Sequence, residues 1–126
     1  MSKYDGINIQ WPISELILSG EKVIETRTYK IPDHYLNQEI LMIETPGPNG
    51  KFKSRIVAII KFTECFQYKN KTDFYKDSKK HCVDKNSPWA WTDKPKWGWK
   101  VEIIKKLSPP IKCNIRGITF RKGIEI

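Results

Sequence analysis

The sequence predicts a single α+β domain, mainly β, folded as a closed or partly open β-barrel with short flanking helices. Short stretches rich in β-branched residues are separated by glycine and proline turns, which is typical of a small all-β core. A β-sandwich would give much the same list of strands and is the alternative. Two modest helical patterns occur, and they do not alternate with strands as they would in a parallel α/β sheet. At 126 residues the chain can bury one hydrophobic core but not two. We therefore expect one domain over residues 1–126.

The first half of the chain predicts strands around one helix. Apolar residues alternate with polar ones over residues 6–10, which indicates a short strand. A helix is expected over residues 12–19, because Pro12 suits a first helical turn and Gly20 can take the left-handed conformation that ends a helix. Further strands are expected over residues 21–29, 39–45 and 55–66, separated by turns at 31–33 and 46–50. The strand over residues 39–45 has apolar residues on both alternating faces, so both faces are expected to be covered.

The second half predicts one helix and two more strands. Thr72 is a candidate cap for a polar helix over residues 73–82, which we expect to lie on the barrel surface beside a cleft. A strand over residues 101–107 is expected to end at Pro109 and Pro110, because proline cannot donate to a sheet ladder. Residues 118–126 alternate loosely and predict an edge strand.

Three charged residues lie close together where the first helix meets the second strand. In an extended chain Glu25 and Arg27 point to the same face, and Lys22 stands at the junction. One interpretation is a structural ion pair that closes one end of the barrel. The other is a polar group that lines a ligand cleft. We expect the cleft, because a structural pair would not need the third charge.

The same segment, residues 9–27, resembles the ASCH domain, a branch of the PUA-like superfamily. The resemblance rests on a Gly-x-Lys-x-x-Glu-x-Arg pattern made by Gly20, Lys22, Glu25 and Arg27. The later features follow in the expected order: a hydrophobic strand at 55–62, Trp-Ala-Trp at 89–91, Gly-Trp-Lys-Val at 98–101 and Pro-Pro at 109–110. The resemblance covers about residues 7–117, and it implies a PUA-like barrel with flanking short helices.

The resemblance also implies a function on RNA. PUA-like domains commonly bind RNA, sometimes through a pocket for one base. We therefore expect recognition of single-stranded RNA or a modified base in a cleft lined by Lys22, Glu25 and Arg27.

Two alternatives stay open beside RNA binding. Some small ASCH-like proteins resemble amidohydrolases of N4-acetylcytidine, and others resemble ribonucleases. The amidohydrolase branch uses a lysine and a threonine three residues later, with a distant glutamate; here Lys22 matches the lysine and Glu25 takes the place of the threonine. If the chain is an enzyme, Lys22 and Glu25 are its candidate catalytic residues. The other alternative is a protein-interaction domain.

The positive charge is concentrated in the second half of the chain. Residues 1–63 carry eight Lys and Arg against seven Asp and Glu, whereas residues 64–126 carry fifteen against seven, which is +8 of the total +9. Such an excess favours a polyanionic partner. Because no basic amphipathic helix is evident, nucleic acid is favoured over a membrane. A lysine-rich surface that only keeps the protein solvated is the alternative.

Four tryptophans fall within residues 89–99, among lysines. Tryptophans usually pack in a core, so two of the four are assigned to packing. Trp91 or Trp97 is expected to offer its ring to unpaired bases, and Lys94, Lys96 and Lys100 are expected to lie near enough to contact phosphates.

Other patterns bear on cofactors and location. The three cysteines are widely spaced and only two histidines accompany them, so neither a disulfide framework nor a zinc site is indicated. There is no phosphate-binding glycine loop, nucleophile elbow or zinc-deaminase signature, and no metal or cofactor is expected. With neither a signal peptide nor an apolar run of about 20 residues, we expect an intracellular, cytoplasmic monomer, with the nucleus as an open alternative.

Overall fold

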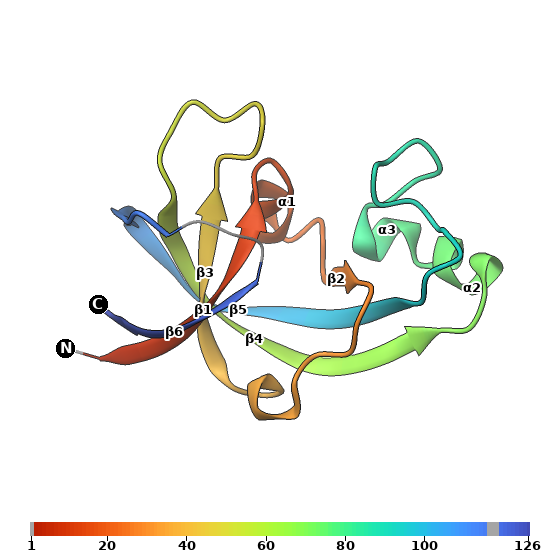
Figure 1. Cartoon of the computed structure of the whole chain (residues 1–126), viewed down its shortest axis with the longest axis horizontal. Coiled ribbons are helices and arrows are strands. Elements are labelled where there is room, and N and C mark those ends of the chain that lie inside the picture. The colour runs from red at the N-terminus through yellow and green to blue at the C-terminus, as the bar shows by residue number, and fades with distance from the viewer. Residues whose placement is uncertain (1, 116–118) are drawn as a thin grey trace.

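The computed structural model describes residues 2–115 and 119–126. The core of the fold is a six-stranded sheet (Figure 1). Its order is β2-β5-β4-β3-β1-β6. Strands β1 and β3 are parallel, and the other neighbouring pairs are antiparallel. The bounds are β1 (Lys3–Gln10), β2 (Ile24–Arg27), β3 (Glu39–Thr45), β4 (Arg55–Tyr68), β5 (Lys96–Lys112) and β6 (Phe120–Glu125).

The sheet does not close into a barrel within the described residues. Strands β2 and β6 are its two edges, so of the two expected alternatives the closed barrel is not confirmed. We call the gap between β2 on one side and β1 with β6 on the other the seam. Side chains cross it: Arg27 of β2 donates to the backbone carbonyl of Asn8 in β1 at 3.2 Å. Beside it, Trp99 of β5, the strand that pairs with β2, stacks on Phe120 of β6 at 6.0 Å between ring centroids.

Hydrophobic clusters cover both faces of the central strands. Ile40 and Met42 of β3 belong to the larger cluster, whereas Leu41 and Ile43 belong to a smaller one. Because successive side chains of a strand point to opposite faces, β3 is buried on both sides, as its sequence predicts. The long β4 and β5 extend beyond the rest of the sheet and carry two short helices near one end (Figure 1).

The first helix, α1 (Ile13–Ser19), ends as predicted. Gly20 has φ 85°, in the left-handed region, and its N–H donates to the carbonyl of Ile17 at 3.1 Å. A 3-10 turn, η1 (Asp33–Tyr35), follows β2. No helix among the described residues is both long and apolar enough to cross a membrane.

The predicted helix over residues 73–82 was wrong in its bounds and its cap. Two short helices, α2 (Lys71–Lys76) and α3 (Ser78–His81), replace it. Asn70 caps α2 because its backbone is extended and its side-chain oxygen accepts the N–H of Asp73 at 2.8 Å. Thr72 therefore lies within the helix and not before it.

Strand β5 is much longer than predicted. It begins at Lys96 and runs through Pro109 and Pro110, which were expected to end it. Ile56 of β4 pairs with Ile111, and Ala58 pairs with Lys106, so residues 107–110 stand opposite Val57 alone. This irregularity accommodates both prolines, because bulged residues need not donate to the ladder. The predicted strand over residues 118–126 is β6, although Ile118 lies outside the described residues.

Candidate functional site

A cavity of about 350 Å³ opens at the seam. Strands β1 and β2 provide much of its lining, and Trp89, Lys96 and Thr119 from later segments complete it. Its volume lies within the range of roughly 300–1,000 Å³ that is typical of small-molecule sites. The place where the sheet fails to close is therefore also where a ligand has room.

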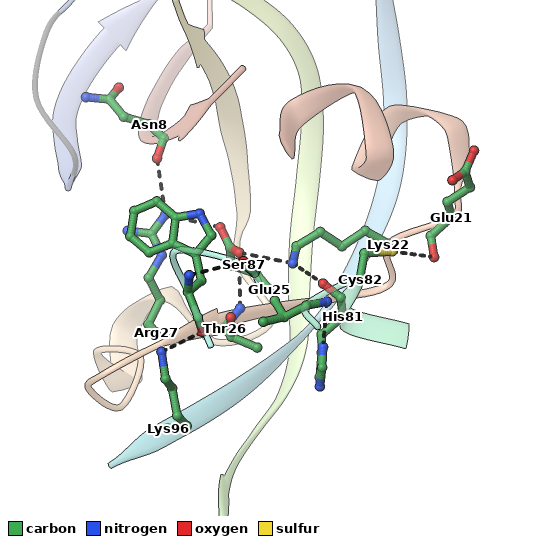
Figure 2. Close-up of polar contacts among 12 residues, drawn as sticks. Asn8, Glu21, Lys22, Glu25, Thr26, Arg27, His81, Cys82, Ser87 and Lys96 are labelled. Atoms are coloured by element: carbon green, nitrogen blue, oxygen red, sulfur yellow. Dashed lines mark hydrogen bonds and ion pairs between the residues drawn. The ribbon is translucent and has the colours of Figure 1, made fainter. Parts of the chain in front are cut away.

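Lys22, Glu25 and Arg27 all line this cavity. Glu25 lies between the two cations: Oε1 is 3.8 Å from Nζ of Lys22, and Oε2 is 3.2 Å from Nη2 of Arg27. Figure 2 shows the side chains of Lys22 and Arg27 directed toward Glu25, which lies between them. Their side chains are only 4%, 8% and 16% exposed for Lys22, Glu25 and Arg27. The group is thus a buried ion-pair network that also faces a cavity, and the two interpretations of the sequence are not exclusive.

The local fold explains why these residues meet. After the turn at Gly20, the backbone N–H of Lys22 donates to the carbonyl of Leu16 at 2.9 Å, which fixes the chain where it leaves α1. Pairing of β2 with β5 then sets the alternation that places Glu25 and Arg27 on one face.

The Arg27 guanidinium has several partners. It lies 5.7 Å from the ring centre of Trp99, and its Nη1 donates to the hydroxyl of Tyr29 at 3.5 Å. Burial acts to lower the pKa of Arg27, but the nearby Glu25 carboxylate and Tyr29 more than offset it, so the pKa is raised overall. Arg27 therefore remains a fixed positive charge in the wall of the cavity.

His81 anchors the other cation, a role that no pattern in the sequence indicates. The buried ring accepts the N–H of Val83 on Nδ1 at 3.0 Å, so Nε2 carries the proton and donates to the carbonyl of Phe74 at 2.7 Å. The backbone carbonyl of His81 accepts a hydrogen bond from Nζ of Lys22 (Figure 2). Burial lowers the pKa of His81, which favours the neutral ring that this geometry requires.

The environment of Lys22 disfavours its charged form compared with water. Burial lowers its pKa, and the Glu25 carboxylate only partly opposes this shift. A lysine with a lowered pKa can accept a proton or act as a nucleophile closer to neutral pH. The same side chain can also donate hydrogen bonds to a ligand without any chemistry.

The tryptophan at the cavity is Trp89. It is 47% exposed and belongs to the lining. Trp91 is half-buried against the cluster of Tyr68, Phe74 and Val83, and Trp97 is half-buried against the larger core cluster. Stacking by Trp91 or Trp97 stays a prediction, but neither residue lines the cavity.

The three predicted phosphate-binding lysines occupy different environments. Lys94 and Lys100 are exposed, and Lys100 pairs with Glu64 at 3.4 Å. Lys96 is buried, lines the cavity and donates from Nζ to the backbone carbonyl of Trp89 at 2.9 Å. Burial lowers the pKa of Lys96. Only Lys96 of the three is therefore placed to contact a ligand inside the cavity.

Residues that hold metals do not gather in the described part of the chain, where no group of three His, Cys, Asp or Glu side chains has suitable placement. The polar lining of the cavity instead consists of lysine, arginine, carboxylate, amide and hydroxyl groups. These groups suit hydrogen bonding and proton transfer with an organic ligand.

Comparison with known proteins identifies the fold. No protein-family model and no curated protein sequence matches this chain. The crystal structure of an ASCH protein from Zymomonas mobilis superimposes with a TM-score of 0.71 and 13% identity, covering 94% of this chain and 85% of that chain. A variant of that protein with tyrosine replaced by phenylalanine gives 0.71 and 14%, covering 96% and 90%. A variant with serine replaced by alanine gives 0.68 and 13%, covering 94% and 86%. The chain therefore has the fold of an ASCH domain, as the pattern from Gly20 to Arg27 predicts.

Proposed function

We propose that this protein binds single-stranded RNA by holding one unpaired base, ordinary or modified, in the cavity at the seam. The observation that carries the proposal is the convergence of Lys22, Glu25 and Arg27 on a cavity bordered by the exposed ring of Trp89. An unpaired base offers a flat face for an aromatic ring and an edge of donors and acceptors for polar side chains. The cavity supplies both kinds of partner.

The charge of the whole chain supports a polyanionic partner. The formal net charge is +9, and most of it comes from residues 64–126. A positive surface attracts RNA from a distance and contacts phosphates without reading sequence. Base capture in the cavity would then add the preference for unpaired RNA.

A titration with labelled oligonucleotides tests the proposal. Single-stranded RNA of mixed sequence is compared with a duplex of the same sequence at low and moderate salt. We expect tighter binding to the single strand, because a paired base must leave its stack before it can enter the cavity. Equal affinity for the duplex would contradict base capture, and absence of binding at low salt would favour the protein-interaction alternative.

One observation favours a second candidate function, hydrolysis of an acylated nucleoside such as N4-acetylcytidine. Lys22 is buried, its pKa is lowered, and Glu25 lies 3.8 Å away with its Oε1 also accepting the N–H of Thr26 at 3.0 Å. A lysine and an oriented carboxylate could activate water and return the proton to the leaving amine. The amide C–N bond would break, releasing acetate and cytidine.

Release of acetate from N4-acetylcytidine tests this candidate, with Lys22→Arg as the decisive variant. Arginine keeps the positive charge but cannot give up its proton, so turnover should be lost while binding is retained. Binding of the acetylated nucleoside by the unmodified protein without any release of acetate would exclude the hydrolase and leave the binding function.

A further inference from the structure

The charged residues that line the cavity do not balance. The described lining includes three cationic side chains, those of Lys22, Arg27 and Lys96, and one carboxylate, that of Glu25. Glu25 is within 4.0 Å of both Lys22 and Arg27. The Glu25 carboxylate is therefore already shared by Lys22 and Arg27, which leaves the charge of Lys96 without a carboxylate partner in the described lining.

Lys96 is a buried lysine whose positive charge has no close carboxylate. Its side chain donates to the backbone carbonyl of Trp89, and among residues 2–115 and 119–126 no Asp or Glu oxygen lies within 4.0 Å of Nζ. Lys96 is only 6% exposed. Buried charges in proteins are normally paired, because removing a charge from water is costly. An anionic group of a ligand in the cavity would supply the counter-charge that Lys96 lacks.

The position of Lys96 relative to Trp89 suggests what that anionic group belongs to. The Lys96 ammonium group donates to the backbone carbonyl of Trp89, and the side chains of both residues line the cavity. Lys96 itself is fixed at the start of β5, where it pairs with Tyr68 of β4. Hydroxyl groups of Thr26, Thr28 and other threonines also line the cavity, and hydroxyls are good donors to phosphate oxygens.

We propose that the cavity binds a nucleotide and not merely a nucleoside, with Lys96 contacting the phosphate ester of the nucleotide whose base lies against Trp89. This inference rests on the proposed function, because it assumes that the base enters the cavity. It adds that the phosphate belongs to the same site and is recognised by a lysine that is buried before the ligand arrives. Lys22 and Arg27 strengthen the attraction through their net positive charge, while Glu25 keeps them in place.

A structural role for Lys96 is the competing explanation, since its hydrogen bond to the Trp89 carbonyl could simply hold the loop before β5. Lys96→Gln separates the two roles. Glutamine keeps an N–H donor for the carbonyl but removes the positive charge that a phosphate requires. Lys106→Gln is the matched control, because Lys106 is an exposed lysine on the same strand and does not line the cavity.

Isothermal titration calorimetry with small ligands tests the inference. The four common ribonucleosides, their 5′- and 3′-monophosphates and short dinucleotides are titrated into the unmodified protein, Lys96→Gln and Lys106→Gln. We expect at least one monophosphate or dinucleotide to bind about tenfold more tightly than its nucleoside, because hydrogen bonds to charged groups are the strong ones. Lys96→Gln should remove most of this preference and leave the nucleoside affinity nearly unchanged, whereas Lys106→Gln should change neither. Inorganic phosphate should compete with the monophosphate and not with the nucleoside.

The possible failures are distinguishable. Equal affinity for nucleosides and monophosphates, unaltered by Lys96→Gln, would overturn the phosphate site and leave base binding standing. Equal weakening of nucleosides and monophosphates by Lys96→Gln would assign Lys96 to positioning Trp89. If no nucleoside, nucleotide or dinucleotide binds, the proposed function itself fails. Preference for dinucleotides over both monophosphates would identify the bound group as the phosphodiester of an RNA chain.

Discussion

Arg27 donates from Nη2 to the backbone carbonyl of Asn8 at 3.2 Å, and so connects the edge strand β2 to β1 across the seam. The same Nη2 is 3.2 Å from Oε2 of Glu25. One guanidinium therefore joins two strands that share no backbone ladder and also orients the carboxylate of the cavity. Arg27 has a structural role and a place in the candidate site at once.

The first prediction is that Arg27→Ala destabilises the protein. It leaves the buried Glu25 with Lys22 alone, and removal of one partner from a buried pair typically costs about 3–5 kcal/mol. Denaturant unfolding followed by circular dichroism measures the change. Lys100→Ala is the control, because its ion pair with Glu64 is exposed and such pairs contribute about 0–1 kcal/mol. Similar losses in the two variants would show that Arg27 is not part of a buried network.

The second prediction separates the tryptophans. Trp89→Ala should weaken binding of single-stranded RNA by about 1–3 kcal/mol per stacked base and leave the melting temperature near that of the unmodified protein. Trp91→Ala should lower the melting temperature instead, because Trp91 packs against Phe74 at 5.6 Å between ring centroids. Fluorescence titration and thermal unfolding on both variants check this. A Trp89→Ala variant that melts early and binds normally would contradict the assignment.

The third prediction concerns alkaline pH. Burial lowers the pKa of Lys22 and of Lys96 in the folded protein, whereas the unfolded chain keeps the ordinary value of 10.5. Between the lowered values and 10.5 the unfolded chain binds more protons, so the free energy of unfolding should rise with pH in that window. At lower pH both states are protonated and the cost of the buried charges is constant.

The measurement is denaturant unfolding from pH 7 upward, with Lys96→Met as the comparison. That variant should be as stable as the unmodified protein or more so at pH 7, and it should lose part of the rise with pH. This window ends near pH 10. Burial raises the pKa of Tyr35 to about 12 and also raises the pKa of Tyr68. Above pH 10 both tyrosines therefore ionise in the unfolded chain before they ionise in the folded protein, and the free energy of unfolding falls. A stability that falls between pH 7 and 9 would contradict the lowered lysine values.

The fourth prediction concerns the lysines outside the cavity. If Lys94 and Lys100 contact RNA phosphates, each change to glutamine should reduce the slope of log affinity against log salt by about 0.7 for single strands. The affinity should fall by a similar factor for every sequence, because phosphate contacts carry no sequence information. Fluorescence anisotropy at several salt concentrations measures the slope. Unchanged slopes would limit the RNA contact to the cavity and its surroundings.

Local sequence signals predicted much of the fold. The left-handed end of α1 at Gly20 and the doubly buried alternation of β3 follow from properties of a few neighbouring residues. The end of β5 could not be predicted in this way. Pro109 and Pro110 break a regular ladder, but they are tolerated here because β4 offers a single residue, Val57, opposite the whole bulge. Sheet closure likewise depends on long-range geometry that no local pattern contains.

The candidate site likewise contains some residues whose positions local sequence patterns predict and others whose positions they do not. Lys22, Glu25 and Arg27 are neighbours in sequence, so strand periodicity and the turn before them were enough to bring them together. Trp89 and His81 come from the segment before β5, and their placement depends on the path of that segment over the sheet. Composition could show that tryptophans and lysines were abundant there, but not which ring faces the cavity or that His81 would accept a hydrogen bond from Lys22 through its backbone.

The open seam also determines how the protein should respond when the cavity is filled. β2 has only four residues and forms a ladder on one side, with β5, so few backbone hydrogen bonds protect it from local opening. A molecule bound in the cavity would contact β1 and β2 together and resist their separation. Local opening of β2 would then require the bound molecule to leave. The binding free energy of that molecule is therefore added to the free energy of opening β2. We therefore expect the backbone amides of β2 to exchange hydrogen more slowly when the cavity is occupied.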